Sequence, residues 1–155
     1  MSDVFVELSA AITGFTSVDV YGTGLVDSYR STVTGIVGEE TLGELLAAWE
    51  RVRDEAGDDA DKLTDALRRD IFSDPKLGPI TRALIKLWYA GTWYELPPEW
   101  SEAYGVPEGD STFAVSPSAY TEGLLWQALG TNPPGAKGPG FASWTGPPNF
   151  EGMTT

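Results

Sequence analysis

The chain contains no cysteine and no histidine among its 155 residues. Without cysteine it can form no disulfide bond, thiolate nucleophile or Cys-ligated zinc or iron–sulfur centre. Without histidine it can form no Ser-His-Asp triad, histidine general base or His-ligated metal site. We therefore expect no catalytic residues, no metal ligands and no cofactor-binding residues here, and a chain that is not an enzyme on its own.

Basic residues are also scarce. Ten Lys and Arg face 23 Asp and Glu, which gives a formal net charge of −13. Such a chain repels the phosphates of nucleic acids and the head groups of anionic membranes. Neither is an expected partner.

Long hydrophobic runs are missing as well. No stretch approaches 18 uncharged apolar residues, so we expect no membrane-spanning segment. The first residues carry neither a basic segment nor a twin-arginine pair. We expect a cytoplasmic protein, with export to the periplasm on a partner as the alternative.

Apolar residues recur at helical spacing through most of the chain. The clearest stripe is Leu42, Leu45, Leu46, Trp49 and Val52. Strand signals are few, so the pattern predicts an all-α bundle of five or six helices. Starts and stops set by Ser, Asp, Gly and Pro place these helices at 2–14, 19–33, 39–52, 63–72, 79–91 and 116–130.

Two segments are expected to lack helices. Residues 95–115 contain Pro97–Pro98, expected to stop any helix, and read as a surface loop with a short extended piece at 112–115. The second is a Gly/Pro-rich extended arm at 131–155 that carries Phe141 and Trp144. We expect a helical domain over 1–130, with the arm packed on a partner or on the chain's own helices.

The tryptophans divide into two groups. Trp49 and Trp88 lie on helical stripes, which predicts core positions. Trp93 and Trp100 fall near the predicted loop and are ambiguous. Together with Tyr94 and Tyr104 they support an alternative function, a stand-alone helical module that stacks these rings on a carbohydrate. A carboxylate-dependent hydrolase using Glu95, Glu99 and Glu122 is a weaker alternative.

Three segments resemble one protein family. They are AYTEGLLWQALG at 119–130, followed by NPPGAK at 132–137 and PGFASW at 139–144; FVELSAAITGF at 5–15; and IKLWYAGTW at 85–93. They resemble the small subunits of FAD-dependent sugar and polyol dehydrogenases of the sorbitol dehydrogenase type. That family is related in role to the small subunit of gluconate 2-dehydrogenase.

The resemblance implies an accessory subunit that binds no cofactor itself. In that family a large flavoprotein of the GMC type carries the FAD and the catalytic residues, and the small subunit supports its folding, stability or export. Some of these complexes add an electron-transfer cytochrome. Members often carry a twin-arginine signal, which this chain lacks. The residues expected to contact the large subunit are Trp93, Trp100, Tyr120, Trp126, Pro134, Lys137, Phe141 and Trp144.

Overall fold

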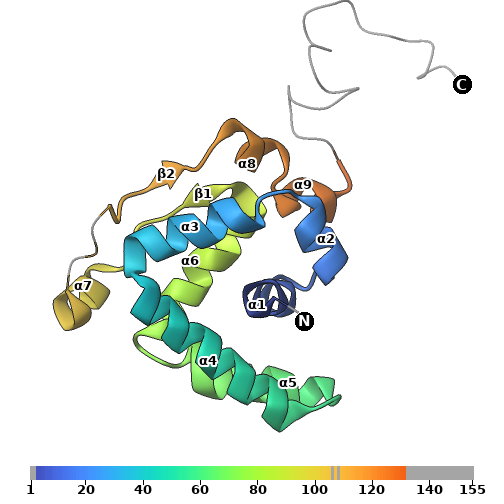
Figure 1. The fold of residues 1–155 in the computed structure, drawn as a ribbon, viewed down its shortest axis with the longest axis vertical. Coiled ribbons are helices and arrows are strands. Elements are labelled where there is room, and N and C mark those ends of the chain that lie inside the picture. The colour runs from blue at the N-terminus through green and yellow to red at the C-terminus, as the bar shows by residue number, and fades with distance from the viewer. Residues whose placement is uncertain (1–2, 106, 108, 132–155) are drawn as a thin grey trace, which may run out of the picture.

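The structure is a computed structural model that describes residues 3–105, 107 and 109–131. Its described part is all-α apart from two two-residue strands, which confirms the predicted fold class (Figure 1). Of the predicted arm at 131–155, all but Thr131 lies outside the described residues. The elements, in chain order, are α1 (Val4–Thr13), α2 (Ser17–Gly22), α3 (Val26–Val37), α4 (Glu39–Ala56), α5 (Ala60–Leu67), a π-helical turn η1 (Arg68–Phe72), α6 (Leu77–Ala90), β1 (Thr92–Trp93), α7 (Pro98–Tyr104), β2 (Phe113–Ala114), α8 (Pro117–Thr121) and α9 (Leu124–Leu129).

The first helices begin at side chains that cap them. The Asp3 carboxylate accepts hydrogen bonds from the backbone N–H of Phe5 and Val6, so Asp3 is the N-cap of α1. Gly14 ends α1 in the left-handed conformation, as predicted. The predicted second helix is two helices instead. Thr16 caps α2 in a capping box with Asp19, and α3 begins only after Leu25.

The core lies where α1, α3, α4 and α6 pack together, with α6 behind α3 in Figure 1. Trp88 of α6 is fully buried, and its ring meets Tyr29 of α3 edge-on at 4.7 Å between centroids. Trp49 is 4% exposed. The predicted core positions of Trp49 and Trp88 are therefore confirmed.

The segment after α6 contains more structure than the sequence predicted. Thr92 pairs with Ala114 and Trp93 with Phe113 in an antiparallel bridge, close to the expected extended piece. Between these strands lies α7, which starts at Pro98. The expectation that Pro97–Pro98 stops any helix was wrong, because a proline at the first helical position has no N–H to lose and a φ suited to the helix.

Candidate partner-binding surface

The C-terminal helices α8 and α9 are seated on the end of α6 by two glycines. Gly91 ends α6 with φ +70°, and a Cβ at this position would lie 2.5 Å from the backbone of Ala119. A Cβ on Gly123, between α8 and α9, would lie 2.6 Å from the Tyr89 carbonyl oxygen. Glycine at both positions lets the backbones of α8 and α9 approach α6 more closely than any side chain would allow.

The opening helix supports the same region from the other side. Trp88 Nε1 donates to Ser9 Oγ at 2.9 Å, and the Tyr89 hydroxyl donates to the Thr13 carbonyl at 2.7 Å. Ser9 and Thr13 are buried, so these bonds satisfy polar groups that would otherwise be costly to bury. Residues from 5–15, 85–93 and 119–130 therefore meet in one packed junction.

The last predicted helix is broken in two at Gly123. Ser116 caps α8 by accepting from the Ala119 N–H at 3.0 Å, and Pro117 takes the first helical position, as predicted. The helix ends at Glu122, Gly123 has an extended ψ of 134°, and α9 starts at Leu124. Leu124 is 1% exposed and holds α9 against the core.

The outer side of this helix pair carries aromatic and aliphatic side chains. Tyr120 is 40% exposed, and its ring meets that of half-buried Trp126 edge-on at 5.5 Å between centroids. Trp126 Nε1 donates to the Tyr120 carbonyl at 2.8 Å, which fixes the indole across the break between the helices. Leu129 at the end of α9 is 64% exposed. Both rings are therefore held in one orientation at the surface.

Two of the predicted interface residues are removed from this surface by burial. Trp93 is 0% exposed and donates to Asp110 Oδ1 at 2.9 Å, whereas Trp100 is 5% exposed and donates to the Lys76 carbonyl at 2.8 Å. Each indole is enclosed by the chain's own core in this structure, and the predicted contacts of both with a partner stay predictions. Of the other predicted residues, Tyr120 and Trp126 lie together, and Pro134, Lys137, Phe141 and Trp144 lie outside the described residues.

The same burial bears on the sugar-stacking alternative. Of its four rings, Tyr94 and Tyr104 are the exposed ones, and Lys86 Nζ lies 5.4 Å from the Tyr94 ring centroid and Lys76 Nζ 5.7 Å from that of Tyr104. The four rings therefore do not present one exposed platform in this structure, and the alternative stays a prediction.

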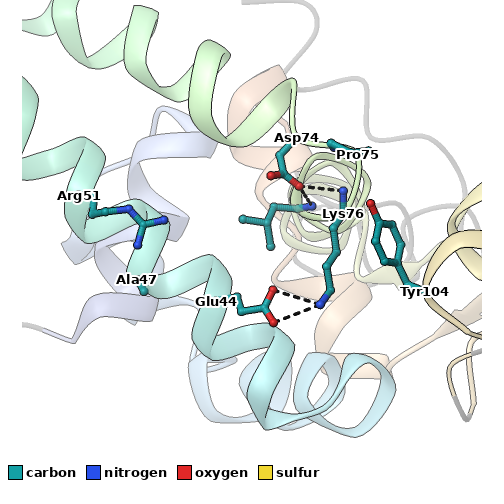
Figure 2. A pocket seen from close by; sticks show the side chains of 8 residues that line it. Glu44, Ala47, Arg51, Asp74, Pro75, Lys76 and Tyr104 are labelled. Atoms are coloured by element: carbon teal, nitrogen blue, oxygen red, sulfur yellow. Dashed lines mark hydrogen bonds and ion pairs between the residues drawn. The ribbon is translucent and has the colours of Figure 1, made fainter.

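A cleft of about 470 Å³ lies between α4, the start of α6 and the end of α7. Figure 2 shows the side chains that line it. Both carboxylates in it are already engaged. Both Glu44 oxygens lie within 3.1 Å of Lys76 Nζ, and Asp74 accepts from the N–H groups of Lys76 and Leu77 at the start of α6. The cleft thus offers structural ion pairing and capping rather than a paired acid and base. Among the described residues, acidic side chains form no group of three or more that could hold a metal ion.

The sequence did not single out Gly91 and Gly123 as packing residues, nor Val18 and Tyr21 as exposed ones. The glycine signal was present as Gly91 after a helix and Gly123 within one, but the segments they contact lie about 30 residues away, so helical periodicity could not reveal it.

Every helix in the described part of the chain is too short or too polar to span a bilayer. The chain matches no family model, no curated protein and no solved structure.

Proposed function

We propose that this chain is the non-catalytic small subunit of a flavin-dependent sugar or glycoside dehydrogenase. It binds and stabilises a large GMC-type subunit that carries the FAD. The observation that carries the proposal is the rigid Tyr120–Trp126 pair, presented at the surface on helices that glycine contacts lock to the core. Aromatic residues held in place in the unbound chain lose little entropy on docking, which suits them to act as binding hot spots.

The identity of the partner comes from the resemblance of the three segments. In the structure, the residues of the C-terminal segment at 119–130 divide into a buried group and a surface group. Ala119, Gly123 and Leu124 are buried and serve packing, whereas Tyr120 is 40% exposed and Trp126 is half-buried at the surface. We place the interface with the large subunit on this outward side, and the complex localises wherever the large subunit is delivered.

Co-expression with a candidate GMC-type flavoprotein tests the proposal. The two chains should elute together, and Trp126→Ala should weaken the complex by roughly 30-fold, the cost of about 2 kcal/mol that a tryptophan hot spot carries. Tyr104→Ala on α7 is the matched control and should leave the affinity within about twofold, since its ring lies outside the proposed surface.

Removing the aromatic side chains of the predicted arm should also weaken binding to the large subunit. Phe141→Ala with Trp144→Ala should lower the yield of folded flavoprotein more than it lowers the melting temperature of this chain. Elution of the wild-type chain apart from the flavoprotein would rule the proposal out.

A further inference from the structure

We propose that a groove between α1 and the helix formed by α5 and η1 binds a small amphipathic carboxylate, a medium-chain fatty acid in chemical class. The hydrocarbon chain lies along the apolar walls of the groove, and the carboxylate binds the guanidinium group of Arg68. Figure 1 places α5 at the lower end of the molecule and α8 and α9 towards the upper end, so the groove is separate from the proposed partner-binding surface. The inference does not depend on the proposed function.

The groove combines mostly apolar walls with a single charged side chain. Its volume of about 330 Å³ lies within the range of about 300–1,000 Å³ that is typical of small-molecule sites. The residues that line it are Ala11, Ile12, Thr64, Leu67, Arg68 and Phe72. Among the described residues that line the groove, Arg68 is the only charged one. An apolar cavity with one charged group is the usual composition of a site for an amphipathic ligand.

Helical spacing explains how the sequence builds the two walls. Helix α5 runs directly into η1, and Thr64, Arg68 and Phe72 are spaced four residues apart along them, so they lie on one side of the combined helix. Ala11 and Ile12, near the end of α1, form the facing wall and are half-buried. The groove therefore joins the opening helix to a segment more than 50 residues later in the sequence.

The wall formed by η1 is held in place by contacts of its backbone. Ser73 donates to the Arg68 carbonyl through its N–H at 3.0 Å and through its hydroxyl at 2.6 Å. The Phe72 carbonyl accepts from Arg82 Nη2 at 2.9 Å, and a Cβ on Gly78 would lie 2.5 Å from the same oxygen. Both ends of η1 are thus fixed before a ligand binds, which lowers the entropy lost on binding. Turns of the π type are also frequent at functional sites.

The charge of Arg68 selects the ligand. Arg30, Arg53 and Arg69 form ion pairs with carboxylates of the chain. The Arg68 side chain is exposed and makes no hydrogen bond or ion pair within the part of the chain that the structure describes. A guanidinium group binds a carboxylate through two parallel hydrogen bonds. A ligand that satisfies both the apolar walls and this group carries a hydrocarbon chain and a carboxylate.

Titration of the full chain with hexanoate, octanoate and 1-octanol, followed by amide chemical shifts in NMR spectra, tests the inference. The titrations use about 150 mM NaCl, which limits the repulsion from the net charge of −13 to about 8 Å. Octanoate should shift the amides of 11–12, 64–68 and 72. Its affinity should exceed that of hexanoate by about two- to fourfold for each added methylene, because each buries more apolar surface. The alcohol should bind about tenfold more weakly than octanoate, because it offers no carboxylate to Arg68.

A charge-matched pair of variants tests the role of Arg68. Arg68→Gln should weaken octanoate binding about tenfold, to the level of 1-octanol. Lys62→Gln removes the same charge from an exposed position of α5 outside the groove and should change the affinity by less than about twofold. Both variants should keep the wild-type melting temperature, because both side chains are exposed.

Three results would each overturn the inference. They are wild-type binding of octanoate no tighter than that of 1-octanol, shifts confined to residues outside the groove, and wild-type affinity in Arg68→Gln. The first two use the wild-type chain and therefore do not depend on how the variants fold. None of the three bears on whether the chain binds a flavoprotein.

Discussion

Two tyrosine hydroxyls in the core differ in whether they are satisfied. The Tyr89 hydroxyl donates to the Thr13 carbonyl at 2.7 Å. That of Tyr29 is buried and has no hydrogen-bond partner in the part of the chain that the structure describes. Burial also raises the pKa of Tyr29 well above its ordinary value of 10.0. One hydroxyl therefore stabilises the fold and the other costs free energy.

Replacing each tyrosine with phenylalanine measures this difference. Tyr89→Phe should lower the free energy of unfolding by about 1 kcal/mol, and Tyr29→Phe should leave it unchanged or raise it by up to about 1 kcal/mol. The pH dependence has a definite sign. Since the folded pKa of Tyr29 is raised, its contribution is fully present below 10.0 and is lost as the pH rises further. Urea titrations at neutral and alkaline pH should show that Tyr29→Phe loses less stability than wild type above pH 10.0; an equal loss would contradict the assignment.

Residue environments could be predicted from sequence only where the element itself was regular. Trp49 and Trp88 lie on long helical stripes, and their burial followed from spacing alone. Trp93 and Trp100 lie beside prolines and glycines, where no periodicity distinguishes inside from outside. Their burial depends on acceptors elsewhere in the chain, Asp110 for Trp93 and the Lys76 carbonyl for Trp100, which only the tertiary structure brings near.

At the scale of elements, the seating of α8 and α9 depends on backbone contacts at glycine. Gly123 has φ −56°, a value open to any residue, so only the missing Cβ matters there. Gly123→Ala places a methyl group 2.6 Å from the Tyr89 carbonyl oxygen. It should lower the free energy of unfolding by about 1–3 kcal/mol, as overpacking does, and speed hydrogen exchange in α9.

Gly43→Ala is the matched control for this substitution. Gly43 lies exposed within α4, and a Cβ there meets nothing within 4 Å. Alanine should therefore raise the free energy of unfolding by about 0.5–1 kcal/mol through helix propensity. Equal effects of the two substitutions in urea titrations would show that α8 and α9 do not depend on the close approach at Gly123.

Element boundaries show the same limit of sequence patterns. The third predicted helix is α4, whose stripe and acidic first turn determine it locally. The second predicted helix is interrupted at Gly24, whose φ is +72°, and the last one is broken in two because its short-range signals favour a single helix while contact with α6 favours two. At 116–130 the break at Gly123 lets both halves contact the end of α6. The break removes helical hydrogen bonds, and tertiary contacts must offset the free energy lost with them.

At the scale of the whole molecule, residues 5–15, 85–93 and 119–130 converge on one junction. Ser9 and Thr13 bond to Trp88 and Tyr89, and Ala119 and Gly123 lie against the end of α6. The residues at this junction therefore serve packing within the chain.

The net charge of −13 sets the response of the whole fold to salt. Two effects oppose each other. Salt screens the repulsion among 23 acidic side chains, which stabilises the folded state, and it weakens ion pairs such as Arg53–Glu7 and Arg69–Glu55, which destabilises it. These pairs are partly or largely exposed, so solvent screens them and each contributes little to stability, and repulsion should dominate.

Raising NaCl from about 10 mM to about 150 mM shortens the screening length from roughly 30 Å to 8 Å. The melting temperature should rise, by about 4 °C for each kcal/mol of repulsion removed. Sodium chloride is the appropriate salt, because sulfate would also strengthen apolar burial and hide the electrostatic effect. Differential scanning calorimetry decides between the two effects: a melting temperature that falls with NaCl would mean that the ion pairs outweigh the repulsion, and that the acidic surface is internally neutralised.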